Sequence, residues 1–200
     1  MVIDQYLDAL KKRRTYYNID KEISIAPCRL QEIISEITVN SPSSFNSQSS
    51  KVVLLFCGKH KLLWEITLEA LRKVTPPEYF PNTEKKIASF AAGAGTILYF
   101  EDDGIVEDLQ AKFPLYADNF PVWASQSSAI LQANIWTALT LEGLGASLQH
   151  YNPLIDDEVK KQLELPESWK LYAQMPFGRP VEPPGEKTSK PAADMVRVIY

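Results

Sequence analysis

Two apolar segments, KVVLLFCG at 51–58 and GTILYFED at 95–102, constrain the fold more than any other feature of the sequence. Short apolar runs are typical of buried strands, because neither face of such a strand carries polar residues for water. A third segment, SWKLYAQMPFG at 168–178, also reads as a strand. The sequence therefore predicts a small sheet with a buried centre.

Apolar residues also recur at the three- and four-residue spacing of helices. The first such stretch ends in the basic sequence KKRR, and the longest is rich in Ala, Ser and Gly, which permits close backbone approach in a fold centre or a dimer interface. We assign no element to the Lys-bearing segment that follows Pro77. The expected helices cover 2–13, 26–39, 60–74, 103–112, 122–145 and 155–164, with an aromatic loop at 113–121.

The chain ends in a Pro-rich, extended tail at 180–191, followed by MVRVIY at 195–200, which alternates like a strand. This strand is expected to pair either with its own sheet or with a neighbouring subunit. No internal repeat or second domain is visible. We therefore expect one domain over 1–200, of the α+β class, with helices around a small mixed sheet.

Composition excludes several classes of protein. The 200 residues are 45% apolar with a net charge of −4, and the only basic cluster is too short for a nucleic-acid-binding face. The two histidines are too few for a His-rich metal site, and the two cysteines lack CxxC spacing. No secretory signal is recognisable, and no apolar run reaches the ~20 residues that span a bilayer. We expect a soluble, cytoplasmic protein without metal, in which Cys57 is buried.

Several familiar motifs are missing. GxxxxGK[ST] and GxSxG do not occur, which excludes a P-loop and a hydrolase elbow. The glycines of AGAGTIL at 92–98 precede a strand, so they predict a turn and not a dinucleotide site. The acidic run EDDGIVED at 101–108 lacks calcium-loop spacing and is expected to be a solvated helix start.

What remains is a set of polar pieces that are distant in sequence. SPSSFNSQSS at 41–50 has seven Ser or Asn residues among its ten and is either a solvated linker or a ligand-holding loop. Arg13–Thr15 follow the first helix, and Lys187 and Lys190 lie on the tail. Together these groups suit a phosphate, a polyol chain and a heteroaromatic ring, although surface Arg and Lys are usually solvated charges.

The chain resembles the FMN-dependent nitroreductase family, and within it the short branch that includes yeast proteins linked to fatty-acid repression and their bacterial relatives. The resemblance covers nearly the whole chain, in the family's order. The segments that carry it are KRRTYYNID (12–20), SPSSFNSQS (41–49), GTILYFED (95–102), PLYADNFPVWASQSSAILQ (114–132), GLGASLQHYNP (143–153) and KLYAQMPFGRP (170–180).

The resemblance implies a flavin site shared by two subunits. Arg13 and Thr15 match the Arg-x-Ser pattern that contacts the FMN phosphate and ribityl chain, with Arg14 at the variable position between them. The SLQHYN turn at 147–152 departs from the family's sequence, and a backbone N–H near His150 would face flavin N5. The remaining cofactor-binding residues that it implies are Pro42, Ser43, Ser44, Asn46 and Gln48 from the partner subunit, Gln149, and Lys187 or Lys190, with Lys85 a fainter candidate.

Phe45, Tyr116 and Tyr151 are expected to line the substrate cleft, although Tyr116, Tyr151 and Trp123 are also typical of packing residues. The resemblance implies a homodimeric, FMN-dependent NAD(P)H oxidoreductase that reduces nitroaromatics or quinones by ping-pong hydride transfer through flavin N5. No side-chain nucleophile is then required. The alternatives are a flavin-binding regulatory or redox-sensor protein with little turnover, and a structural dimer without cofactor.

Overall fold

The computed structural model describes residues 2–200 and contains one five-stranded sheet. Its strand order is β1-β5-β3-β2, with β4 also paired to β5. Every pairing between these strands is antiparallel, and an isolated bridge between Thr15 and Ala146 adds a parallel contact. The expected mixed sheet is thus predominantly antiparallel. The strands are β1 (Ile19–Asp20), β2 (Ser50–Phe56), β3 (Gly95–Asp102), β4 (Gly145–Ala146) and β5 (Trp169–Pro180).

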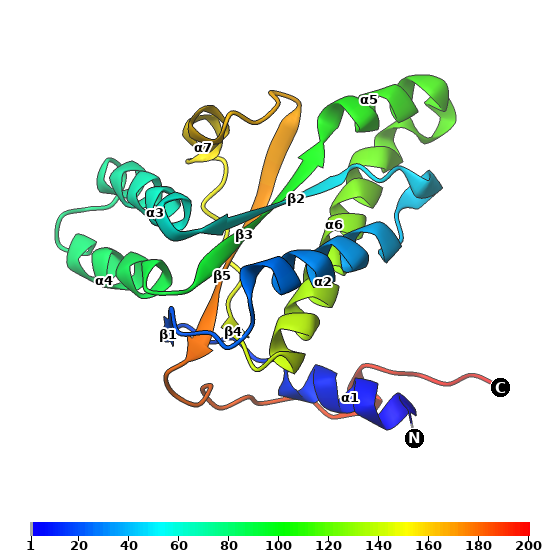
Figure 1. Cartoon of the computed structure of the whole chain (residues 1–200). Coiled ribbons are helices and arrows are strands. Elements are labelled where there is room, and N and C mark those ends of the chain that lie inside the picture. Colours follow the sequence, from blue (N-terminus) through cyan, green and yellow to red (C-terminus); the bar gives the residue numbers. More distant parts are fainter. Residues whose placement is uncertain (1) are drawn as a thin grey trace.

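Helices cover both faces of this sheet, with α2 and α6 on one side and α3 and α4 on the other (Figure 1). Short 3-10 turns lie at Ser44–Asn46, Pro114–Asn119 and Ala192–Asp194. The α+β class expected from the sequence is confirmed. The helices are α1 (Val2–Lys12), α2 (Pro27–Asn40), α3 (Cys57–Arg72), α4 (Phe80–Ala91), α5 (Asp103–Lys112), α6 (Phe120–Leu141) and α7 (Asp156–Leu163).

Strand β3 joins the two halves of the core, because its side chains alternate between the faces of the sheet. Ile97 and Tyr99 pack in the cluster formed with α2 and α6, whereas Leu98 and Phe100 pack in the cluster formed with α3, α4 and α7. All four side chains are at most 1% exposed. The buried strand predicted from GTILYFED is therefore confirmed, and it spans the predicted residues.

Helix α4 and the two short strands β1 and β4 are absent from the sequence-based assignment. Pro81 lies in the first turn of α4, where the missing N–H costs nothing because that group has no intrahelical partner. Strands of two residues leave no periodic signal. Because prolines precede α4 and lie in its first turn, the sequence pattern did not predict this helix.

Helices α3 and α6 differ from their expected bounds by more than the others do. Helix α3 begins at Cys57, directly after β2 ends, so CG belongs to the helix and not to the strand. Cys57 has φ +50 and is exposed, which corrects the expectation that it is buried. Helix α6 ends at Leu141, and Gly143 adopts φ +76, a left-handed conformation that favours glycine after a helix.

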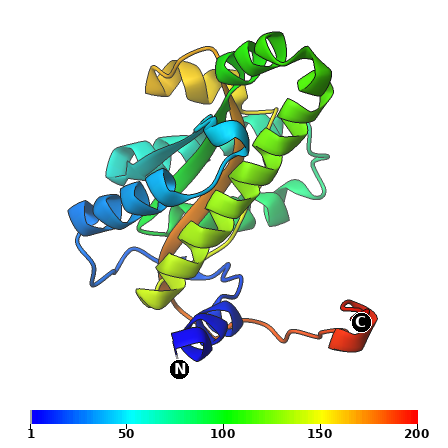
Figure 2. The same ribbon diagram turned by 90° about the vertical axis from the view of Figure 1, so that its right-hand side faces the viewer.

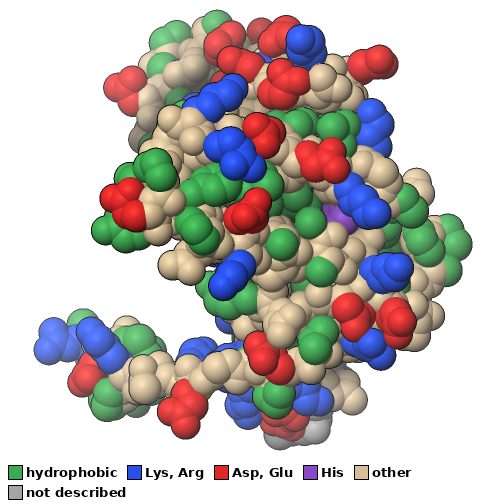
Figure 3. Space-filling view, turned by 90° about the vertical axis from the view of Figure 1, so that its left-hand side faces the viewer, with side chains coloured by type: hydrophobic (Ala, Val, Ile, Leu, Met, Phe, Trp, Pro, Cys, Tyr) green, Lys and Arg blue, Asp and Glu red, His purple; other side chains and the backbone are tan. Residues whose placement is uncertain are grey.

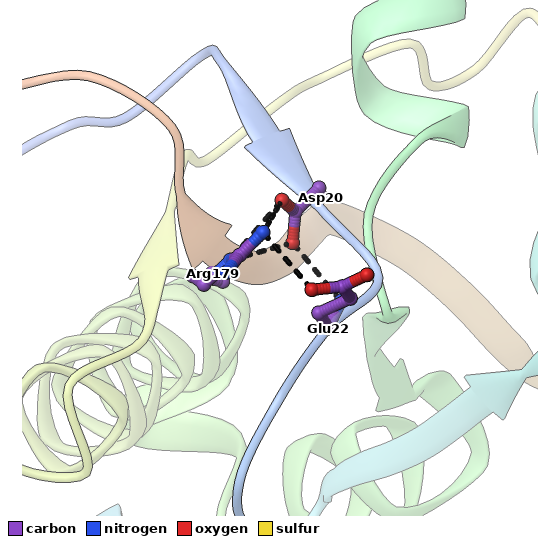
Figure 4. Close-up of polar contacts among 3 residues, drawn as sticks. All are labelled: Asp20, Glu22 and Arg179. Atoms are coloured by element: carbon purple, nitrogen blue, oxygen red, sulfur yellow. Dashed lines mark hydrogen bonds and ion pairs between the residues drawn. The ribbon is translucent and has the colours of Figure 1, made fainter.

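An ion-pair clip holds β1 against the end of β5 (Figure 4). Arg179 Nη2 lies 2.6 Å from Asp20 Oδ2 and 3.1 Å from Glu22 Oε2. The hydrogen bond from Arg179 lowers the pKa of the Asp20 carboxyl. The backbones approach closely beside this clip, since a Cβ on Gly178 would collide with the Asp20 carbonyl oxygen. The clip fixes the segment that leads from α1 into the sheet.

The C-terminal tail stands off the body of the molecule (Figures 2 and 3). Residues 195–200 form no strand and are exposed, so the pairing with the chain's own sheet is not observed. Pairing of this segment with a neighbouring subunit stays a prediction. Near its start the tail is tied to the body, because Arg14 Nη2 donates a hydrogen bond to the carbonyl of Gly185.

Candidate functional site

The Ser-rich tract forms an ordered loop between α2 and β2. Phe45, Asn46 and Gln48 have φ values of 57°, 52° and 51°, which residues other than glycine rarely adopt. The loop's own polar groups hold this shape: the N–H of Gln48 donates to Ser43 Oγ at 3.0 Å, and Gln48 Nε2 donates to Asn46 Oδ1 at 3.2 Å. Such backbone strain is typical of functional loops and unusual in a linker.

A cluster of aromatic rings adjoins this loop. Phe45 is 51% exposed, and its ring lies 5.0 Å from Phe113, 5.3 Å from Phe120 and 6.0 Å from Trp123, measured between ring centroids. Tyr116 completes the cluster at 6.1 Å. The structure thus brings Phe45 and Tyr116 together beside the loop, where planar ligands would find an apolar wall.

A buried carboxylate lies beneath the loop. Glu101 is 0% exposed and accepts a hydrogen bond from Ser50 Oγ, while its Oε2 has no partner among the described residues. Burial raises the pKa of Glu101, and the hydroxyls of Ser50 and Ser49 oppose that rise. The expectation of a solvated run is therefore wrong at Glu101, because this residue belongs to the end of β3. A charged residue at the end of an apolar strand was the available signal.

A hollow of about 150 Å³ opens between the loop and α6. Its lining combines hydroxyl and amide groups with one apolar wall, and Ser50 connects it to the buried Glu101. The residues at its surface include Pro42, Ser43, Gln48, Ser50, Ser127 and Leu131.

The basic segment lies elsewhere, at the end of α1. Thr15 forms a bridge with Ala146, and the N–H of Tyr16 donates to the carbonyl of Ala146 at 3.0 Å. The guanidinium carbon of Arg13 lies 4.4 Å from the ring centroid of Trp136 on α6. Arg14 instead reaches the tail at Gly185. Neither arginine is paired with a carboxylate among residues 2–200.

The turn at 147–152 begins directly after Ala146 and pairs with β5. The N–H of Gln149 donates to the carbonyl of Gln174 at 2.7 Å, and the N–H of Tyr151 donates to Gln174 Oε1 at 2.8 Å. The side chain of His150 is exposed. The backbone N–H of His150 has no acceptor in the described part of the chain. Tyr151 packs edge-on against Trp64, and burial raises the pKa of its phenol to about 12.

Among residues 2–200, no hydrogen bond or ion pair joins the remaining predicted cations to the Ser-rich loop or to Arg13–Thr15. Lys187 and Lys190 lie exposed on the tail beyond Gly185, and Lys85 lies exposed on α4. Sequence reasoning also missed Trp136 and Gln174, which hold Arg13 and the 149–151 turn respectively. Both occupy regular elements and offered no motif.

Two groups of predicted residues lie at opposite ends of α6 (Figure 1). The loop group is the Ser-rich loop with the rings of Phe45 and Tyr116, and the basic group is Arg13–Thr15. The loop group contacts α6 through Trp123, and the basic group contacts it through Trp136. These two residues are separated by about 20 Å along the helix, at a rise of about 1.5 Å per residue. A single chain does not join them into one pocket. Among residues 2–200, no helix is long and apolar enough to cross a membrane, and no three His, Cys, Asp or Glu side chains gather at a metal site.

Comparisons with known proteins agree with this architecture. HBN1 of Saccharomyces cerevisiae is 38% identical over 186 residues, which are 92% of each protein. The structure of nitroreductase CinD from Lactococcus lactis, in complex with chloramphenicol, is 43% identical and superposes with a TM-score of 0.90, over 98% of this chain and 100% of CinD.

A more distant solved structure shows the same fold. It is a protein from Desulfovibrio desulfuricans in complex with FMN, 17% identical, with a TM-score of 0.70 over 97% of this chain and 96% of that one. The family model described as "Nitroreductase family" matches residues 10–179. The chain therefore belongs to the nitroreductase family of oxidoreductases.

Proposed function

We propose that this chain is an FMN-dependent NAD(P)H oxidoreductase of the cytoplasm that reduces nitroaromatics or quinones as a homodimer. The observation that carries the proposal is the separation of the two groups along α6. One group offers unpaired guanidinium and a hydroxyl, and the other offers hydroxyls, amides and aromatic rings. A two-fold dimer can bring the basic group of one chain beside the loop of the other.

The donors present fit FMN. No carboxylate among the described residues pairs with Arg13, so its guanidinium donors are available to a phosphate. The side chains of Thr15, Ser44 and Asn46 offer hydroxyl and amide groups for a polyol and a ring edge. A bound FMN would supply the redox chemistry, which is hydride transfer from NAD(P)H and reduction of the acceptor in ping-pong order.

The 149–151 turn supports a role in orienting the ring. Gln174 fixes this turn on both sides of His150, through the N–H groups of Gln149 and Tyr151. The N–H of His150 is the group left without an acceptor within residues 2–200. A rigidly held backbone donor of this kind stabilises negative charge that develops on a ring nitrogen.

The acceptor class follows from the aromatic cluster around Phe45. A half-exposed ring wall favours planar aromatic acceptors, which stack on such rings. CinD was solved with chloramphenicol and with 4-nitrophenol, both of which are nitroaromatic compounds. We therefore assign nitroaromatics or quinones as the substrates of the proposed site.

The first test is the absorbance spectrum of the purified protein, before and after anaerobic addition of NADH or NADPH. Flavin bands that bleach with the reductant and return with a quinone or a nitroarene support the proposal. Bands that persist with both nicotinamides favour a flavin-binding sensor with little turnover. A protein that stays colourless after incubation with FMN contradicts the proposal.

A second test addresses the shared site. Arg13→Ala and Asn46→Gly each disable both pockets of a homodimer, but a hybrid of the two variants contains one intact pocket. Random re-association places about half of the chains in hybrids, so about a quarter of the wild-type activity returns on mixing. No recovery after verified subunit exchange would show that Arg13 and Asn46 do not act in one pocket contributed by two chains.

A further inference from the structure

The guanidinium of Arg13 stacks on the indole of Trp136 and has no carboxylate partner among the described residues. The guanidinium carbon lies 4.4 Å from the indole centroid, within the range of a cation–π interaction. Trp136 is partly buried and packs against the core cluster that contains Ile135. The backbone N–H of Arg13 donates to the carbonyl of Ala9 at 3.0 Å, which continues the turn of α1.

Arg72 and Arg179 are paired with carboxylates, whereas Arg13 is not. Arg72 also stacks on a ring, that of Phe80 at 4.3 Å, but its Nε lies 3.3 Å from Glu69. Arg179 is held by two carboxylates. Stacking uses only the face of a guanidinium, so it leaves the in-plane N–H donors of Arg13 available and its charge intact. This arrangement suits an anion that arrives from outside the chain.

The indole itself carries a cost that packing alone does not explain. Trp136 Nε1 is buried without an acceptor among the described residues. A buried donor without a partner destabilises the folded state, and a phenylalanine would fill the space without one. Tryptophan, however, presents the best ring face for binding a cation. The cost is therefore consistent with a role in holding Arg13.

We propose that Trp136 is a positioning residue that holds the Arg13 guanidinium in place for the phosphate of FMN. This inference rests on the proposed function, in which Arg13 meets that phosphate. Without the indole, Arg13 regains rotamer freedom that FMN binding must then remove. Loss of the contact weakens FMN binding about 3- to 30-fold.

Riboflavin separates this role from a structural one, because it has the same ring as FMN and no phosphate. Dissociation constants for both ligands are measured by quenching of flavin fluorescence in the cofactor-depleted dimer. We expect Trp136→Leu to weaken FMN binding and leave riboflavin binding unchanged, and Trp136→Phe to fall between Leu and wild type. In the Arg13→Ala background, Trp136→Leu should have no further effect on FMN.

Trp169→Leu is the matched control, since Trp169 is a partly buried tryptophan that packs on Phe100 in the other half of the core, with no arginine stacked on it. It should leave the ratio of the two dissociation constants unchanged. Equal losses of FMN and riboflavin binding in Trp136→Leu and Trp136→Phe, or no loss of FMN binding in either, would overturn the inference. A wild-type protein that binds neither flavin overturns the proposed function together with this inference.

Discussion

Ser50 and Glu101 face each other directly across the β2–β3 pair, and the Ser50 hydroxyl donates a hydrogen bond to the buried Glu101 carboxylate. The contact joins the first residue of β2, next to the Ser-rich loop, to the central strand of the sheet. One carboxylate oxygen has no further partner in the described chain. Because burial raises the pKa of this acid, we expect the stability of the loop region to depend on pH.

Glu101→Gln tests that dependence. Burial raises the folded-state pKa of Glu101 above its ordinary value of 4.5, so the folded chain holds the proton more tightly than the unfolded chain. The stability that the folded chain gains from this proton is fully present below the unfolded-state pKa of Glu101. It is lost as pH rises through the folded-state pKa. The difference in unfolding free energy between the variant and the wild type should therefore shift in favour of the variant as the pH rises from 4 to neutral. Urea unfolding at several pH values measures this, and a pH-independent difference would contradict it.

Thr96→Val should destabilise the core under α3. His60 Nε2 faces the carbonyl of Ala91 and must donate, so Nδ1 accepts from the Thr96 hydroxyl, which in turn accepts from Trp64 Nε1 at 3.0 Å. Valine leaves two buried groups without partners, at a cost of about 2–3 kcal/mol in the free energy of unfolding. Thr96→Ser keeps the hydroxyl and should cost clearly less. Equal costs for the two variants would show that the hydroxyl contributes little.

Ser43→Ala should loosen the Ser-rich loop. Its hydroxyl accepts the Gln48 N–H at 3.0 Å and helps to hold the left-handed residues between them. We expect a loss of about 1 kcal/mol in unfolding free energy and weaker FMN binding. Ser35→Ala, on the exposed side of α2, is the control and should leave FMN binding unchanged without lowering the unfolding free energy, because alanine is the better helix former. Identical FMN affinities for wild type and Ser43→Ala would contradict the proposed role of the loop.

Phe45 combines a strained backbone with ring contacts, and two substitutions separate these effects. Phe45→Ala removes the ring and keeps a side chain at φ +57, whereas Phe45→Gly removes both the ring and the strain. The Gly variant should be more stable than the Ala variant by about 1 kcal/mol. Both should raise the KM for a nitroarene to a similar extent, because both lose the aromatic wall. Chemical denaturation and steady-state kinetics provide the two measurements.

Much of the fold could be predicted from periodicity. The strand at 95–102 and the helix at 103–112 have the expected bounds, because each has a clear apolar pattern and a sharp end. Helix α4 could not be predicted in this way, since Pro76, Pro77 and Pro81 mimic a loop. The exposure of Cys57 was also inaccessible, because it depends on a left-handed turn at a strand–helix junction.

The candidate site was less accessible to sequence than the fold. The resemblance supplied Arg13, Thr15 and the Ser-rich loop, but their separation along α6 depends on three-dimensional structure. Trp136 is notable for its stacking with Arg13, and Glu101 for its burial. Both features depend on neighbours that are distant in the sequence. No local pattern distinguishes such residues from ordinary core positions.

The junction between β2 and α3 sets a limit on how this chain can vary in length. Phe56 ends the strand and Cys57 begins the helix, with no connecting residue between them. One inserted residue would rotate α3 by about 100° and carry His60 away from Thr96. The connection between α3 and α4, at 73–79, carries no such constraint. Insertions and deletions in descendants of this protein should therefore accumulate there and spare the junction at 56–57.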